Sequence, residues 1–97
     1  MVADDYIPDR GHIVWLNFTP QAGHEQAGHR PALVLSPFEY NQRIGLALCC
    51  PITSRAKGYP FEVALPITSA VRGVVLTDQI KSLDWKARDA RYECDAT

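Results

Sequence analysis

Short runs of apolar residues separated by glycine, proline and polar turns recur along the chain, and this pattern is typical of β-strands. The runs recur every 8 to 15 residues with almost no helical period, which favours a small antiparallel barrel or sandwich over a fold with alternating strands and helices. The expected strands are residues 12–18, 31–36, 46–53, 61–65 and 73–77, and the last is expected to continue through residues 79–83, with Ile80 and Leu83 buried.

One segment predicts a short helical turn instead. Residues 37–43 lack the alternation of the strands; they begin with Pro37, and Ser36 directly precedes them. Serine is a favoured cap at a helix N-terminus, and proline is favoured at the first helical position. We therefore expect Ser36 to cap this turn and Pro37 to be its first residue.

The composition fits one compact domain over residues 1–97. Of its 97 residues, 46% are apolar, which is enough for a single core and too little for two domains. The net charge of −1 gives no indication of a nucleic-acid partner. The cations, however, concentrate in residues 30–92 while residues 1–29 are acidic, so this charge distribution allows an anion-binding face. Residues 1–11 show no secretory signal, and the apolar run 44–52 is too short to span a bilayer.

The cysteines and histidines indicate neither disulfides nor a metal site. Three cysteines are an odd number, and Cys49 and Cys50 are adjacent, so on a strand their side chains would point to opposite faces. Reduced thiols in the cytoplasm are the expected state. The spacings of the cysteines and of His12, His24 and His29 do not match a zinc motif, and we expect no metal and no cofactor.

Two polar loops, residues 21–31 and 53–60, carry the candidate chemistry. Cleavage of RNA by its own 2′-hydroxyl needs a base, an acid and donors for the phosphate, and it needs no metal. Arginine offers phosphate a planar fork of donors, and threonine adds a neutral donor. The loops and the region after them hold suitable side chains at Glu25, His29, Arg30, Thr53, Lys57 and Asp78.

Each of these residues also has a plainer interpretation. Arg30 could be a surface cation, Thr53 a strand end, and Lys57 part of an ordinary turn. Trp15 and Trp85 could stack RNA bases, but large aromatic side chains more often pack in cores or dimer interfaces.

Three stretches of the chain make the functional interpretation specific. They read Glu-Gln-Ala-Gly-His-Arg-Pro at residues 25–31, Pro-Ile-Thr-Ser followed by Lys-Gly-Tyr-Pro-Phe-Glu-Val at 51–63, and Asp-Gln-Ile-Lys-Ser-Leu-Asp-Trp at 78–85. In order and spacing they resemble the MazF toxins of the MazF/PemK family, and the likeness extends over about residues 6–92.

The resemblance implies an all-β fold, a small SH3-like antiparallel barrel of the CcdB, Kid and MazF type. It implies a toxin of a type II toxin–antitoxin system that works as a homodimer, binds a MazE-like antitoxin, and binds DNA as the toxin–antitoxin complex. The implied activity is sequence-specific, metal-independent cleavage of single-stranded mRNA, which leaves a 2′,3′-cyclic phosphate and a 5′-hydroxyl.

The resemblance also assigns roles. Arg30 and Thr53 match the catalytic pair of the family. The positions that match RNA-contacting or assisting sites are Glu25, His29, Lys57, Asp78 and Gln79. The Kid toxin uses the carboxylate matching Asp78 as a base together with an arginine two residues earlier, where this chain has Leu76.

The chain departs from the family at its C-terminal end. Other members continue into an amphipathic helix, whereas residues 92–96 have no helical apolar period. We therefore expect that helix to be missing and apolar barrel surface to be exposed. Two alternatives follow: an inactive remnant that still binds an antitoxin, and a CcdB-like toxin that acts on a protein, although the Trp-Gly-Ile ending of CcdB is absent here.

Overall fold

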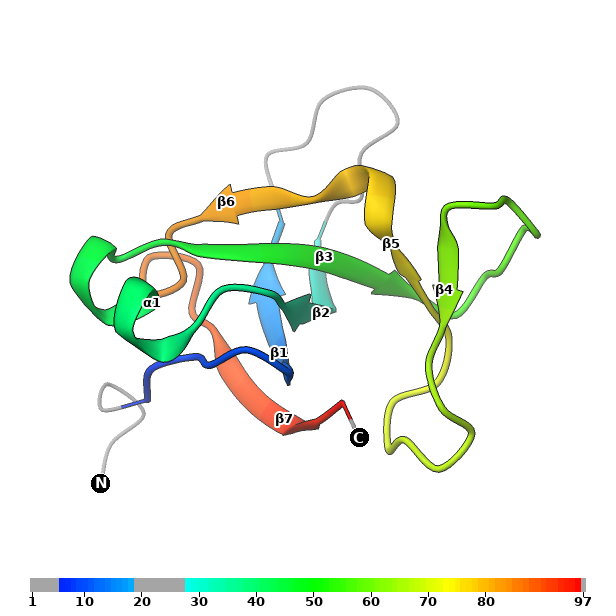
Figure 1. Ribbon diagram of the computed structural model, residues 1–97, viewed down its shortest axis with the longest axis horizontal. Helices are drawn as coiled ribbons and strands as arrows, with labels where there is room; N and C mark the ends of the chain where they lie inside the picture. Colours follow the sequence, from blue (N-terminus) through cyan, green and yellow to red (C-terminus); the bar gives the residue numbers. More distant parts are fainter. Residues whose placement is uncertain (1–5, 19–27, 97) are drawn as a thin grey trace.

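The computed structural model describes residues 6–18 and 28–96, and within them the regular structure is mostly β-strand, with one short helix (Figure 1). The all-β class is confirmed, and each predicted strand is present with shifted ends. The elements are β1 (His12–Asn17), β2 (His29–Val34), α1 (Phe38–Ile44), β3 (Ala47–Thr53), β4 (Glu62–Ala64), β5 (Val74–Leu76), the 3-10 turn η2 (Thr77–Gln79), β6 (Lys81–Leu83) and β7 (Arg91–Asp95).

Strand β3 organises the sheet. Its first half pairs with β6 and its last residues pair with β5, while β2 runs along its other edge, all antiparallel. The order of the sheet is β4-β5-β3-β2-β1-β7, with β6 beside β3. No pairing joins β4 to β7 within the described residues, so the strands form an open, strongly curved sheet rather than the closed barrel that we expected.

The expected continuation of β5 into residues 79–83 is interrupted. The turn η2 separates β5 from β6, and the side chain of Thr77 donates a hydrogen bond of 2.5 Å to the Phe61 carbonyl oxygen. Leu83 is buried as predicted, but Ile80 is 48% exposed, because the turn rotates it out of the period-2 register of the strand.

Strand β7 was not predicted. It pairs with β1, with a register shift between Ile13 and Val14 that marks a β-bulge. Its apolar residues Tyr92 and Cys94 alternate with charged ones, and Ala96 directly after it continues the pattern. This alternation is the signal that could have identified it.

Helix α1 begins one residue later than expected and is capped differently. Pro37 is the N-cap, no side chain of the helix caps its N-terminus, and the carboxylate of Asp9 accepts a hydrogen bond from the Phe38 N–H at 2.8 Å. The expected Ser36 cap is wrong because its hydroxyl donates to the buried Asn41 carboxamide and accepts from the Leu48 N–H.

The two faces of the sheet bury two separate apolar clusters. Cys49 belongs to the cluster that contains Trp85, and Cys50 belongs to the cluster that contains Ile52, which confirms that the adjacent cysteines point to opposite faces. Burial raises the pKa of the Cys49 thiol to about 12 and raises the pKa of Cys50 as well. Both are neutral packing groups, and the three cysteines, Cys94 included, are free thiols.

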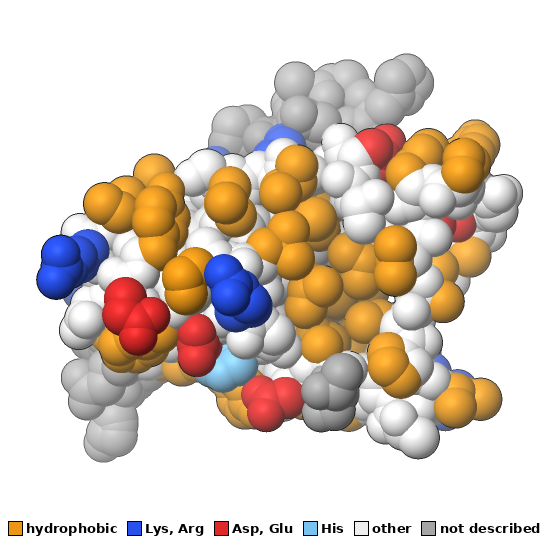
Figure 2. Space-filling view, in the orientation of Figure 1, with side chains coloured by type: hydrophobic (Ala, Val, Ile, Leu, Met, Phe, Trp, Pro, Cys, Tyr) orange, Lys and Arg blue, Asp and Glu red, His pale blue; other side chains and the backbone are white. Residues whose placement is uncertain are grey.

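The second cluster is incompletely covered. Leu33, Leu35, Leu65 and Val71 pack against it while remaining partly exposed. Figure 2 shows apolar side chains gathered over the middle of one face, where the surface is hollowed. Exposed apolar surface of this kind was expected from the sequence, and it marks a face suited to contact with another chain.

No helix within the described part of the chain is long and apolar enough to cross a membrane.

Candidate functional site

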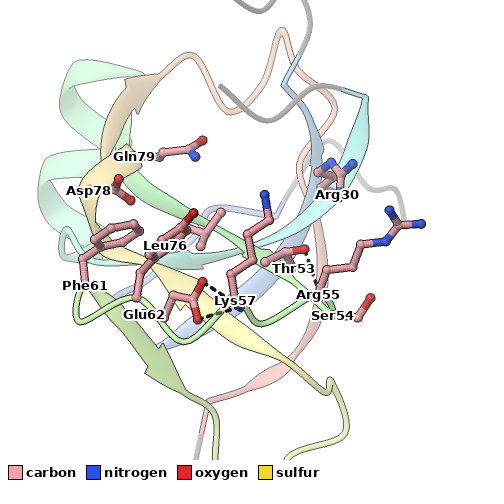
Figure 3. A pocket seen from close by; sticks show the side chains of 11 residues that line it. Arg30, Thr53, Ser54, Arg55, Lys57, Phe61, Glu62, Leu76, Asp78 and Gln79 are labelled. Carbon is pink, nitrogen blue, oxygen red and sulfur yellow. Dashed lines mark hydrogen bonds between the residues drawn. The ribbon is translucent and has the colours of Figure 1, made fainter. Parts of the chain in front are cut away.

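A hollow of about 710 Å³ opens where the end of β3 meets the start of β2, the 54–61 loop and η2 (Figure 3). Hollows of this size are typical of ligand-binding sites. The side chains that line it come from three separate stretches of the chain: Arg30, Thr53, Ser54, Arg55, Lys57, Tyr59, Phe61, Glu62, Leu76, Asp78 and Gln79.

Arg30 and Thr53 come from neighbouring strands. The β2–β3 register pairs Leu33 with Cys50 and Ala32 with Pro51, and Arg30 and Thr53 lie just beyond this last pair, where both line the hollow. Figure 3 shows both side chains on the same wall of the hollow. The two candidate catalytic residues are therefore juxtaposed.

The backbone around Thr53 orients its side chain. Thr53 is only 8% exposed, and its Oγ1 accepts a hydrogen bond from the Arg55 N–H at 3.2 Å. A hydroxyl group that accepts one hydrogen bond retains its own O–H to donate. Thr53 can therefore present a neutral donor to a bound anion.

Gly73 is a neighbour of Thr53 that the sequence analysis missed. It has φ +132°, and a β-carbon built on it would lie 2.2 Å from the Thr53 carbonyl oxygen. Only glycine permits this close approach. The residue directly before β5 therefore decides where the end of β3 lies. A lone glycine before a β-branched run was the available signal.

Gly28, in the motif that precedes Arg30, also has a conformational role. Its φ is +81°, in the left-handed region that favours glycine. Its carbonyl accepts a hydrogen bond from the Phe18 N–H at 2.9 Å, which ties the start of β2 to the segment that follows β1. This turn sets the point at which β2, and with it Arg30, begins.

The loop after Thr53 is held by Glu62, another residue that the sequence analysis did not single out. The N–H groups of Lys57 and Gly58 donate to its carboxylate at 3.0 to 3.1 Å. Figure 3 shows the bonds between Lys57 and Glu62, and the Lys57 side chain extending into the hollow. The sequence signal was an acidic residue four positions after a glycine turn, which can accept the N–H groups of that turn.

Asp78 and Gln79 lie on η2, on the wall opposite Arg30 in Figure 3. Asp78 is exposed and Gln79 is half-buried. The lining thus combines three cations with the two carboxylates of Glu62 and Asp78. The positive groups gather on the side of Arg30, which suits a phosphate bound there.

An aromatic pair completes the hollow. The rings of Tyr59 and Phe61 stack with centroids 5.1 Å apart at 21°, and Tyr59 is 50% exposed. Exposed aromatic faces beside cations are typical of single-stranded nucleic-acid sites. The pair lies within the motif at residues 57–63, but its stacking could be seen only in the structure.

The seven predicted site residues do not all lie in this hollow. Five of them line this hollow: Arg30, Thr53, Lys57, Asp78 and Gln79. His29 instead lines an adjoining hollow beside Trp15. Glu25 lies outside the described residues. Within the part of the chain that the structure describes, no group of three His, Cys, Asp or Glu side chains could hold a metal ion.

The two tryptophans, which the sequence analysis treated alike, differ in their surroundings. Trp85 is buried and its Nε1 donates to the Asn41 carbonyl oxygen at 3.0 Å, so the packing interpretation is confirmed for it. Trp15 is half-buried and faces a hollow.

Comparison with known proteins agrees with this geometry. The endoribonuclease toxin MazF of Escherichia coli K12 is 55% identical over 85 residues, which are 88% of this chain and 76% of that protein. The crystal structure of MazF from Deinococcus radiodurans has a TM-score of 0.92 and 64% identity, and covers 96% of this chain and 84% of that one. A MazE–MazF structure from the same organism has a TM-score of 0.84, 64% identity and the same coverage.

The family model of PemK-like and MazF-like toxins matches residues 9–96. That range includes every strand of the sheet and both walls of the hollow. This chain therefore belongs to the family of PemK-like, MazF-like toxins of type II toxin–antitoxin systems.

Proposed function

We propose that this protein is an endoribonuclease toxin that cleaves single-stranded mRNA at specific sequences without a metal ion, leaving a 2′,3′-cyclic phosphate and a 5′-hydroxyl. The observation that carries the proposal is the juxtaposition of Arg30 and Thr53 across β2 and β3, at the rim of a hollow that Lys57 enters. Endoribonuclease is also the name of the relative in Escherichia coli.

The side chains present meet the needs of that reaction. The 2′-oxygen of the substrate forms a bond to phosphorus, and the bond from phosphorus to the 5′-oxygen breaks. The 2′-hydroxyl loses its proton and the departing oxygen gains one. Negative charge grows on the phosphate oxygens in between, where the Arg30 guanidinium and the Thr53 hydroxyl can donate.

The hollow also suits a single strand better than a duplex. An unpaired base can stack on the Tyr59–Phe61 pair, whereas bases in an A-form helix are already stacked and paired. The attacking 2′-hydroxyl restricts the substrate to RNA, and duplex geometry holds that hydroxyl away from in-line attack.

The decisive experiment incubates the purified chain with end-labelled single-stranded RNA in EDTA. Cleavage should proceed and leave cyclic phosphate ends, while the same RNA in a duplex should resist. If activity disappears in EDTA and returns with magnesium, the metal-independent reaction is wrong. A chain that binds a MazE-like antitoxin but cuts no RNA would be the inactive remnant.

Lys57→Ala should weaken RNA binding without changing the single-turnover rate at saturating RNA. Lys57 is exposed and enters the hollow as a point charge, so it contributes through release of phosphate counterions. The slope of log affinity against log salt should fall by about 1. Lys86→Ala, which removes an equally exposed cation elsewhere, is the matched control. A salt slope unchanged by Lys57→Ala would remove Lys57 from the RNA path.

Homodimerisation and antitoxin binding are further parts of the proposal. The incompletely covered apolar face and exposed side chains such as Ile44 and Val63 supply surface for such contacts. The relative from Deinococcus radiodurans forms a complex with MazE, and we expect a MazE-like antitoxin to bind this face. We also expect the toxin–antitoxin complex to bind DNA and the protein to act in the cytoplasm.

Light scattering should report twice the 10.8 kDa mass of the chain at micromolar concentration. The expected contact pairs the same apolar patch on both copies. A monomer throughout that range would contradict the dimer.

A further inference from the structure

A second hollow, of about 650 Å³, adjoins the first, and Arg30 and Ser54 line both. Its other walls come from β1, the residues before β5, and β7. Its lining residues are Trp15, Gly28, His29, Arg30, Pro31, Ile52, Ser54, Ala70, Val71, Arg72 and Glu93. A group bound at Arg30 therefore has room on two sides, and a nucleotide chain that passes Arg30 would enter both hollows.

The lining of this second hollow includes an aromatic pair. The rings of Trp15 and His29 are nearly parallel, with centroids 6.0 Å apart at 21°. Their strands are paired through Trp15 with Pro31 and Asn17 with His29, so the two rings are diagonal neighbours on one side of the sheet. Trp15 is half-buried and His29 is exposed. The pair is thus a fixed platform with an accessible aromatic surface.

A carboxylate is fixed at the edge of that platform. The Trp15 Nε1 donates a hydrogen bond to Glu93 Oε1 at 3.1 Å, from β1 to the neighbouring β7. An ionised carboxylate only accepts hydrogen bonds, and it has lone pairs on both oxygens. The bond to Trp15 orients Glu93 and leaves its other oxygen, Oε2, able to accept from a ligand bound beside Trp15.

We propose that this hollow is a base-binding subsite, in which the base next to the phosphate at Arg30 stacks on Trp15 and His29 and donates its exocyclic amino group to Glu93. The proposal rests on the proposed RNA-cleaving function and adds a specificity determinant to it. Arg72, also in the lining, supplies a cation for the adjacent phosphate. Proteins read unpaired bases through this combination of stacking and hydrogen bonds to base edges.

The chemistry of Glu93 selects the class of base. A carboxylate accepts from an amino group, such as N4 of cytosine, but it repels the carbonyl oxygen that uracil carries at the same position. Cytosine and uracil have rings of the same size and stack alike, so they isolate this one contact. The subsite should therefore favour a base that carries an amino group over uracil.

The test measures the binding of 2′-O-methyl pentacytidylate and pentauridylate, which cannot be cleaved because they lack the attacking hydroxyl. The parent chain should bind the cytidylate about tenfold more tightly, with quenching of tryptophan fluorescence as the base covers Trp15. Trp85 is buried and adds a constant background. Trp15→Phe should abolish the quenching and, if it retains the fold by circular dichroism, weaken binding of both pentamers several-fold.

Glu93→Gln should bring the two affinities within about twofold, because an amide can donate to uracil as well as accept from cytosine. Glu93 is exposed on β7, so the substitution should be tolerated by the fold. Glu39→Gln removes the same charge from the exposed first turn of α1 and should preserve the preference. A cytosine preference that survives in Glu93→Gln, or quenching that survives in Trp15→Phe, would overturn the subsite.

Cleavage of unmodified RNA by the same preparations separates this inference from the proposed function. If the parent cuts RNA but binds the two pentamers equally, the subsite is wrong and the endoribonuclease stands. If it binds them with a preference that depends on Glu93 but cuts nothing, the subsite stands and the nuclease activity is wrong.

Discussion

Replacing Arg30 by alanine is expected to lower the single-turnover rate of RNA cleavage by about 10²–10³-fold. Arg30 lies at the start of β2 and lines the same hollow as Thr53, where its guanidinium can meet the charge that grows on the phosphate. A donor aligned in advance stabilises that charge without any reorganisation. Rates should be measured at saturating end-labelled RNA, with circular dichroism to establish that the variant is folded.

Arg43→Ala is the matched control for this substitution. Arg43 is an exposed cation in the last turn of α1, so its loss should not change the rate. Thr53→Val is nearly isosteric and should lower the rate with little change in RNA affinity, because it removes the hydroxyl that can donate to the phosphate. It also removes the acceptor of the Arg55 N–H, so the fold of this variant is checked by circular dichroism. Should Arg30→Ala retain a rate within about threefold of the parent, well short of the expected loss, the catalytic role passes to another residue of the two hollows.

Gly73→Ala is expected to reduce the free energy of unfolding by about 3 kcal/mol or more. A β-carbon at this position would lie 2.2 Å from the Thr53 carbonyl oxygen, on a backbone with φ +132°. Steric overlap and backbone strain therefore act together. The folded fraction should also cleave RNA slowly, since relief of the overlap moves Thr53. Urea unfolding followed by circular dichroism measures the first effect, and single-turnover cleavage measures the second.

Gly58→Ala separates the two contributions. Gly58 also has a positive φ, +81°, but a β-carbon there would meet nothing within 4 Å. Only the backbone cost of about 1 kcal/mol should appear. Equal losses of stability in the two variants would show that the close approach to Thr53 carries no energetic weight.

Local features of this protein could be predicted from its sequence. The apolar run at residues 46–53 predicted β3, and the adjacency of Cys49 and Cys50 on that strand predicted their opposite orientations, because the side-chain period of a strand is set by its own backbone. The motifs around Arg30 and Thr53 predicted both the family and the residues that meet in the first hollow. The motif before Arg30 contains Gly28, but only the structure, in which Gly28 has a positive φ, shows why glycine is needed there.

Which segments lie side by side could be seen only in the folded chain. The meeting of Arg30 and Thr53 in one hollow depends on the pairing of β2 with β3, and the bond from Trp15 to Glu93 depends on the pairing of β7 with β1 across 78 positions of sequence. Likewise, Trp15 faces a hollow and Trp85 is buried, although the sequence offered the same two interpretations for both. The period-2 alternation along a strand indicates on which face of the sheet each side chain lies. It does not indicate which other strand lies beside it. Strand pairing and the open edges of the sheet are properties of the whole packed chain, because each edge is covered or left free by a segment distant in sequence.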